Sequence, residues 1–299
     1  MNRRITRNAW VVLLLMVLVP SAALAQVTSN LERYTGPNAK GYLNPLNEGF
    51  GAALQAGMYH SAAIPRVGIK ISVDLMASLV KFSDADRTFI GTTETGFLPQ
   101  TQARVPTVVG STDGVVVSGD GGAQFIFPGG LDLTSLAVPM PQVTVSGLMG
   151  TQVMGRWISY NTKQEDVGRI KVLGLGVRHS ISQYIPLCPV DIAAGVTWQQ
   201  LQVGTKLIDA NALSFGVQAS KKFAVLEPSA GLSFDTFDMS VEYDYKSQGT
   251  TVPVHVDFGK NTTTHLFAGL GANLGLFHLY GEVGTAGRTI FATSLTVGN

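Results

Sequence analysis

The chain has 299 residues, a formal net charge of +1 at pH 7 and a single cysteine, Cys188. Only 14% of its residues are charged, whereas roughly 25% is typical of soluble proteins. A nearly neutral chain lacks the basic surface that nucleic-acid binding needs, and one cysteine cannot form an internal disulfide framework. We therefore expect no nucleic-acid partner and no disulfide-stabilised scaffold.

The first 25 residues predict a cleaved secretory signal peptide. Arginines at positions 3, 4 and 7 precede an apolar run over 9–19, and Ala23-Leu24-Ala25 gives a small-x-small cleavage pattern. The apolar run is about half as long as the roughly 20 residues of a membrane-spanning helix, which disfavours a transmembrane anchor. We expect Sec-type export with cleavage near Ala25. Cleavage removes three basic residues and no acid, which changes the formal net charge from +1 to −2.

Residues 26–48 predict an irregular N-terminal segment. They are largely polar and contain Pro37 and Pro45, and proline interrupts a helix when it lies in the interior. We expect this segment to be a plug, or a periplasmic lead-in to the domain that follows over 49–299.

Alternation of apolar and polar residues dominates the chain from residue 49 onwards. In 67–79 the odd positions are Val, Ile, Leu and Ala, and the even positions are mostly Gly, Ser, Lys and Asp. This period of two predicts a strand with two different faces. Clear alternation recurs at 190–203, 213–222, 224–235 and 262–274, and weaker alternation at 50–59, 151–160, 168–181, 239–245, 274–283 and 288–298. Short breaks with turn residues between these segments favour antiparallel neighbours.

The segment 81–147 differs from the rest. It is rich in Gly, Pro and Thr and contains short β-like pieces at 107–109, 115–117 and 124–127. It predicts either a long loop with its own hairpin or two more strands.

The composition of the second face favours a membrane barrel over a secreted β-sandwich, which is the alternative. That face carries Gly, Ser, Thr, Gln and Asn with few charges, which suits a packed lumen better than a solvated surface. Several aromatic residues near segment ends fit an interfacial girdle: Tyr59, Trp157, Tyr160, Trp198, Phe234, Tyr243, Tyr245 and Tyr280. We predict an all-β, antiparallel transmembrane β-barrel of about 12 strands, with 10 to 14 allowed. Its partners would be the lipid bilayer of a bacterial outer membrane and the barrel assembly machinery.

Two stretches carry a resemblance to known families. The first is Tyr42-Leu43-Asn44-Pro45-Leu46 with Gly49-Phe50-Gly51 and Gly57-Met58-Tyr59-His60, and the second is Pro139–Gly147 with Gly150-Thr151, Arg156 and Gly174–Ser180. Together they resemble an uncharacterised family of bacterial outer-membrane proteins (DUF6588-like) over nearly the whole mature chain. The second stretch is also similar, over about 60 residues, to the long-chain fatty-acid (FadL-type) transporters. The first resemblance implies a monomeric barrel with its N-terminal segment in or near the lumen. The second implies passage of small hydrophobic molecules.

Strand parity predicts which charged side chains face the lumen. If the odd face of 67–79 meets lipid, Lys70 and Asp74 point inward. The same argument gives six further candidates for lumen-lining residues: Arg156, Arg178, Asp191, Glu227, Asp235 and His265. These charges would either line a pore or form a packed network.

Motifs for catalysis, cofactors and metals do not emerge. The five histidines show no H-E-x-x-H spacing, there is no G-x-S-x-G elbow, and no Gly-rich piece continues into a phosphate loop. We expect no enzyme activity, no cofactor and no metal. Three hypotheses follow: passive transport or binding of small hydrophobic molecules, a structural or assembly barrel with a filled lumen, and an outer-membrane hydrolase that assembles Ser, His and an acid across strands.

Overall fold

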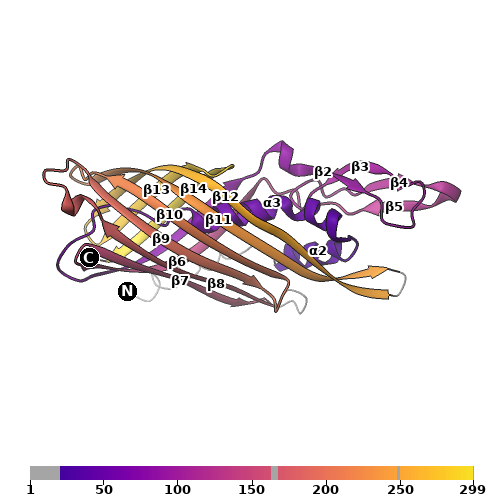
Figure 1. The fold of residues 1–299 in the computed structure, drawn as a ribbon, viewed down its shortest axis with the longest axis horizontal. Helices are drawn as coiled ribbons and strands as arrows, with labels where there is room; N and C mark the ends of the chain where they lie inside the picture. The colour runs from indigo at the N-terminus through magenta and orange to yellow at the C-terminus, as the bar shows by residue number, and fades with distance from the viewer. Residues whose placement is uncertain (1–20, 163–167, 248–249, 299) are drawn as a thin grey trace, which may run out of the picture.

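The computed structural model describes residues 21–162, 168–247 and 250–298. Within these ranges ten antiparallel strands close a barrel in the order β1-β14-β13-β12-β11-β10-β9-β8-β7-β6 (Figure 1). Their bounds are β1 Lys70–Lys81, β6 Ser135–Leu148, β7 Thr151–Asn161, β8 Arg169–Ser180, β9 Asp191–Val203, β10 Ile208–Ser220, β11 Leu226–Ser247, β12 Thr250–Leu274, β13 Phe277–Thr285 and β14 Thr289–Gly298. The barrel closes where β1 pairs with both β14 and β6. Most of the predicted signal peptide, residues 1–20, lies outside the described residues.

The barrel has ten strands rather than the predicted twelve. Ten is the lower limit of the expected range. One predicted strand, 50–59, is mostly helical, because it forms the end of α3 (Gly36–Gln55). Another, 239–245, is the continuation of β11, whose 22 residues run well beyond the barrel wall. For 50–59 the period of two was misleading, because the segment is mostly helical. For 239–245 it correctly indicated β structure but could not distinguish a new strand from the extension of β11.

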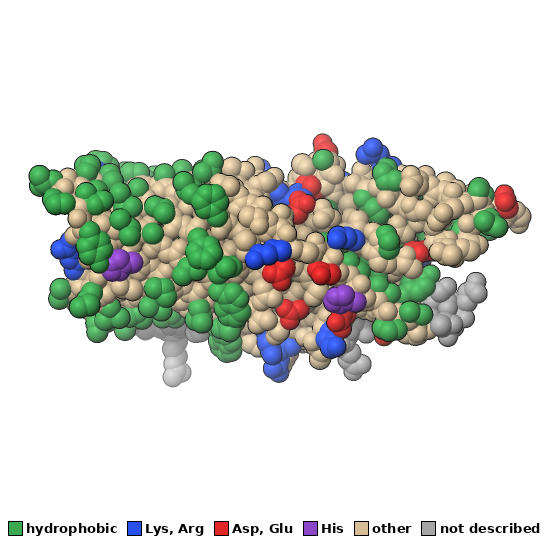
Figure 2. All heavy atoms as spheres, viewed as in Figure 1, with side chains coloured by type: hydrophobic (Ala, Val, Ile, Leu, Met, Phe, Trp, Pro, Cys, Tyr) green, Lys and Arg blue, Asp and Glu red, His purple; other side chains and the backbone are tan. Residues whose placement is uncertain are grey.

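The outer face of the barrel carries an apolar belt (Figure 2). On β12, Leu266, Leu270 and Leu274 are each more than half exposed. The range Leu266–Leu274 and its counterpart Leu226–Phe234 on β11 are each about 27 Å long at roughly 3.4 Å per residue. At a strand tilt near 40° this length spans about 21 Å, close to the ~25 Å band of membrane barrels.

Aromatic residues mark one edge of the belt. Trp157 and Phe234 are 69% and 56% exposed on the outer face, and the next outward positions on β12, Thr264 and Thr262, are polar. Four of the predicted girdle residues lie elsewhere. Tyr59 and Tyr280 are buried in the lumen, and Tyr243 and Tyr245 pack against the core on the extension of β11. Tyr280 belongs to the inward parity of β13, where its hydroxyl hydrogen-bonds Ser229 and Glu282.

The N-terminal segment is helical, which corrects the prediction of an irregular 26–48. Helix α2 spans Ser21–Leu31 and α3 spans Gly36–Gln55. Pro37 lies in the first turn of α3, where a proline removes no helical hydrogen bond. Pro45 lies in the interior and is buried, so packing against the barrel outweighs its propensity cost. Of the helices that the structure describes, none is both long and apolar enough to cross a membrane.

The connection between β1 and β6 forms a small module at one end of the barrel (Figure 1). It contains the short helices η1 (Asp84–Arg87) and η2 (Asp120–Gly122) and two hairpins, β2 (Thr88–Thr92) with β3 (Gln102–Pro106) and β4 (Val115–Ser118) with β5 (Gln124–Phe127). We call residues 82–134 the tip module. Both predictions for 81–147 therefore hold in part, because the segment has its own hairpins and also supplies the barrel strand β6.

Candidate functional site: a filled barrel lumen

The second half of helix α3 and the residues after it lie inside the barrel, whereas the first half packs against the tip module through Asn38 and Gly41. We call residues 36–64 the lumen plug. Helix α3 packs against β1, β6, β10, β11 and β12. Thirteen of its residues are buried, although the helix is not strongly apolar. The charged and polar inner face of the barrel explains this composition, since a plug in a polar lumen needs hydrogen-bonding groups as well as apolar contacts.

Small residues let the plug fit. Ala52, Ala53 and Ala56 form a buried cluster with Val80, Ile290 and Ala292 of the wall. A Cβ at Gly51 would lie 3.0 Å from the Phe237 ring. Gly57, which has a positive φ of 60°, ends the helical part of the plug.

Arg156 of β7 binds the end of α3. It is 1% exposed, and its Nη1 donates to the carbonyl of Leu54 at 2.9 Å. Its Nε donates to Gln142 Oε1 at 2.9 Å and Nη1 to Gln199 Oε1 at 3.2 Å. Gln199 also donates to the Leu54 carbonyl. A guanidinium is well placed there, because the last carbonyls of a helix carry partial negative charge.

Arg178 of β8 binds the extended part of the plug. Its Nη1 donates to the Ser61 carbonyl at 3.0 Å and its Nη2 to Gln218 Oε1 at 2.6 Å. The guanidinium lies 4.3 Å from the centroid of the Tyr59 ring. Gln218 donates in turn to the Tyr59 carbonyl at 3.2 Å. The two arginines thus fix two successive parts of the plug to one wall.

Acidic side chains bind the plug from other strands. Glu282 of β13 accepts the Gly57 amide at 3.0 Å, and Glu227 of β11 accepts the Ser61 hydroxyl. Asp74 of β1 accepts from Gln142, Thr144 and Thr296 and lies 3.7 Å from His60 of the plug.

Six of the eight predicted lumen residues are buried on the inner face: Asp74, Arg156, Arg178, Glu227, Asp235 and His265. Lys70 begins β1 and is exposed, and Asp191 begins β9 and is half-buried. Both therefore lie at the end of the barrel, where a side chain on the inner face is still accessible to solvent. The sequence reasoning did not single out Glu282, although the same parity on 274–283 could have identified it.

A grouping of Ser214, Asp235 and His265 resembles the residue set of a hydrolase. The Ser214 hydroxyl donates to Asp235 Oδ1 at 2.5 Å, and His265 Nδ1 lies 3.5 Å from Asp235 Oδ2. The acid lies between the other two, whereas activation of a serine requires the imidazole next to the hydroxyl. This arrangement does not supply a base to the serine.

Two cavities lie between the plug and the inner face of the barrel wall within the described residues. The first, of about 140 Å³, is lined by His60, Asp74, Glu227 and Tyr280 among others. The second, of about 210 Å³, lies between Gly51 and Gln55 of α3 and the wall around Asp235 and Thr263. Both have mixed polar and apolar linings.

Comparison with solved structures finds outer-membrane β-barrels. A loop-deletion mutant of the outer-membrane protein OmpT of Vibrio cholerae has 10% identity and a TM-score of 0.29, covering 78% of this chain and 99% of that one. The translocator domain of the autotransporter NalP from Neisseria meningitidis has 9% identity and a TM-score of 0.34, covering 88% and 97%. The outer-membrane protease OmpT from Escherichia coli has 6% identity and a TM-score of 0.33, covering 79% and 96%.

These likenesses are too distant to support an argument about function. None of the three is a fatty-acid transporter, so the FadL-type resemblance stays a prediction. A search of curated proteins finds no match. The model of a family of unknown function, DUF6588, matches residues 4–298. The chain therefore belongs to the DUF6588 family, as its sequence resemblance predicts.

Proposed function

We propose that the protein is a bacterial outer-membrane barrel, closed by its own N-terminal segment, that holds the tip module at the cell surface. The closed barrel and its apolar belt support the membrane location, because such a belt is stable only against lipid. This proposal corresponds to a structural or assembly barrel with a filled lumen.

The length of the connections supports an orientation. At one end β6 and β7 are joined by Met149-Gly150, and β12 and β13 by Gly275-Leu276. At the other end lie the tip module and the extended ribbon of β11 and β12 (Figure 1). Outer-membrane barrels have short periplasmic turns and longer extracellular loops, so the tip module faces outward in this proposal.

The observation that carries the proposal is the bonding of the plug backbone to the wall. Carbonyls of Leu54, Tyr59 and Ser61 accept from wall side chains, and the amides of Gly57 and Ala62 donate to wall side chains. A buried backbone group without a partner costs about 1–3 kcal/mol. Withdrawal of the plug would therefore break several bonds at once, which supports a plug that is part of the fold.

Two measurements on the outer-membrane fraction test this proposal. The unboiled protein should migrate differently from the boiled protein on a gel, as a folded barrel does. Liposomes that contain it should not swell in a small sugar such as arabinose. A soluble periplasmic protein without a heat shift, or rapid swelling by the wild type, would refute it.

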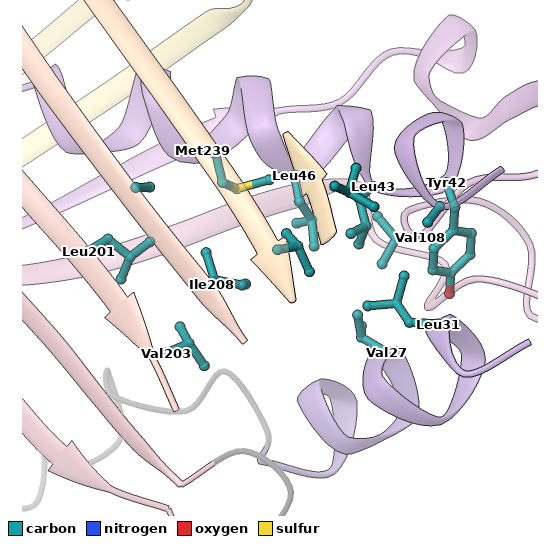
Figure 3. Packing of buried hydrophobic residues seen from close by; sticks show 14 of the residues in the cluster. Val27, Leu31, Tyr42, Leu43, Leu46, Val108, Leu201, Val203, Ile208 and Met239 are labelled. Carbon is teal, nitrogen blue, oxygen red and sulfur yellow. The ribbon is translucent and has the colours of Figure 1, made fainter. Parts of the chain in front are cut away.

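A second candidate function is the binding of small hydrophobic molecules at the outward end. Aliphatic residues of α2 and of the strand ends face each other there, with Val27 and Leu31 on one side and Val203 and Ile208 on the other (Figure 3). The cleft of about 710 Å³ beside them is lined mostly by polar and charged residues, among them Arg169, Lys171 and Glu242, so the aliphatic cluster alone supports this candidate.

A fluorescent fatty acid tests this second candidate. Saturable binding by the purified protein that weakens in Val203→Asn would support it. Binding that is absent, or unchanged by Val203→Asn while the outer belt still adsorbs the probe, would exclude this aliphatic cluster.

A further inference from the structure

The two cavities beside the plug share one side of the lumen. On β12 the inward residues Asn273 and Gly271 line the first cavity, and Asn261 and Thr263 line the second. The inward residues between these two pairs are Gly269, Phe267 and His265. A layer of side chains thus separates the cavities along the β11–β13 wall, over the roughly 27 Å of strand between Thr263 and Gly271 at about 3.4 Å per residue.

Three rings form this layer, and we call His265, Phe267 and Tyr280 the ring layer. Each ring lies over a glycine: His265 over Gly284, Phe267 over Gly231, and Tyr280 over Gly269. A Cβ at any of these glycines would come within 3.0 Å of the ring above it, closer than real side chains pack. The wall therefore has glycine where each ring needs room.

The ring layer meets rings of the plug. The centroid of Phe267 lies 6.4 Å from that of Tyr59, and the centroid of Tyr280 lies 5.0 Å from that of His60. These contacts are between side chains alone. The backbone of the plug is held separately, by Arg156 and Arg178 on the opposite wall and by Glu282 on this one. The Tyr280 hydroxyl hydrogen-bonds the other oxygen of Glu282 and Ser229. Turning the ring layer away from the plug therefore breaks these side-chain bonds but none of the plug's own backbone hydrogen bonds.

The charges along this side are acidic. Asp74, Glu227, Asp235 and Glu282 are all buried and lie on β1, β11 and β13. Arg178 also borders the first cavity, but its guanidinium is occupied by Ser61, Gln218 and the Tyr59 ring.

Two acceptors at the second cavity have no hydrogen-bond partner: Gln55 Oε1, and Asp235 Oδ2, which lies 3.5 Å from His265 Nδ1. Both residues are more than nine-tenths buried. A carboxylate and an amide oxygen attract a cation or a hydrated cation rather than an anion.

We infer that the β11–β13 side of the lumen is a route for small cations, and that the ring layer is its gate. This inference rests on the proposed function, because a gate has meaning only in a barrel that the plug otherwise closes. The expected permeant species are hydrated alkali cations. Their path joins the two cavities when the rings of Phe267 and Tyr280 turn away from the plug.

Planar-bilayer recordings test the gate. The double variant Phe267→Ala/Tyr280→Ala should give conductance steps that wild type lacks, and its reversal potential in a KCl gradient should show preference for K⁺ over Cl⁻. The control variant Met140→Ala removes one large buried side chain from β6, outside the ring layer. The barrel of this variant should stay closed. Adding Asp235→Asn and Glu227→Gln to the double variant should reduce the cation preference at least several-fold.

The possible outcomes separate the two proposals. If wild type already conducts, the closed-barrel proposal fails. If wild type is closed and the heat-shifted double variant is silent or anion-selective, the cation route is wrong and the closed barrel stands. If Met140→Ala conducts as well as the double variant, the ring layer has no special role.

A labelling measurement keeps the inference testable if the double variant does not fold. In a Cys188→Ser background, Thr263→Cys places a thiol at the second cavity. A cationic methanethiosulfonate reagent should modify it several-fold faster than an anionic one of similar size. Equal rates, or faster reaction of the anionic reagent, would overturn the cation route.

Discussion

At the scale of single residues, Arg156 shows how a buried charge can hold one segment inside another. Its guanidinium donates to Leu54, Gln142 and Gln199 and contacts the sulfur of Met76. A buried charge is stable only when its donors are used, and here they are used on the plug and on strands β6 and β9. The same side chain therefore satisfies its own burial and fixes the helix end.

Replacement of Arg156 tests this bonding. Arg156→Met keeps most of the volume but leaves the Leu54 carbonyl with one donor fewer, and it should lower stability by roughly 3 kcal/mol. The measurement is the temperature at which the folded band on an unboiled gel disappears. Arg169→Met is the matched control, since Arg169 is exposed at the start of β8 and its loss should change little. Equal transition temperatures for wild type and Arg156→Met would contradict this role.

A second residue-scale prediction concerns pH. Burial raises the pKa of Asp86, but hydrogen bonds from Arg288 and Ser83 outweigh it and hold the pKa below its usual value. Because the pKa of Asp86 is lower in the folded state, its ionised carboxylate stabilises the protein at pH values above the unfolded pKa near 3.8. This stabilisation is lost as the pH falls through the folded-state pKa. Asp86→Asn should therefore be less stable than wild type at pH 7, and the gap should close below pH ~3. A gap in melting temperature that is independent of pH would refute this.

At the scale of elements, the strands were predictable, whereas the N-terminal segment was predicted as a possible plug but not as a helix. Segments such as 67–79 alternate because one face lies on the apolar outside of the barrel and the other faces the lumen, and six of the lumen residues follow from that parity. The sequence of helix α3 lacks the apolar stripe of an ordinary amphipathic helix, because its surroundings are polar on several sides and close-packed on others. Its glycines and Pro45 therefore resemble loop residues. The contact between Asp74 and His60 could not be predicted from the sequence either, since it depends on how deep in the barrel residue 60 of the plug lies.

Gly57 tests the fit of the plug. Its φ of 60° strains any residue with a side chain, and a Cβ there would lie 2.6 Å from Met76 Cε. Gly57→Ala should destabilise the folded barrel by about 1–3 kcal/mol from backbone strain, with the clash added. The control Gly259→Ala has a φ of 71° but open space around it, so it isolates the strain. If both variants melt alike, the close contact with Met76 has no effect.

At the scale of the whole molecule, the protein has three parts: an apolar belt, a plug inside it, and a tip module at one end. Salt bridges join the barrel to the plug and to the tip module. Arg288, in the turn between β13 and β14, binds Glu48 of α3 and Asp86 of the tip module. A barrel whose plug is joined to its exposed module at the mouth behaves as one rigid support for that module.

The orientation of this support is testable on intact cells. In the Cys188→Ser background, Asp120→Cys at the tip should react with a membrane-impermeant maleimide. Leu276→Cys, which is exposed in the turn at the other end, should react only after the outer membrane is broken. The reverse pattern of labelling would show that the tip module faces the periplasm.

The central claim is that the lumen of the wild-type protein is closed by its own residues 36–64. Its most direct test is a planar-bilayer recording of the purified, heat-shifted wild-type protein in concentrated KCl. We predict a baseline without the long-lived, uniform steps of an open porin, and the appearance of such steps in Arg156→Ala/Arg178→Ala, which releases the plug from β7 and β8. Uniform open-channel steps from the wild-type protein would contradict the account.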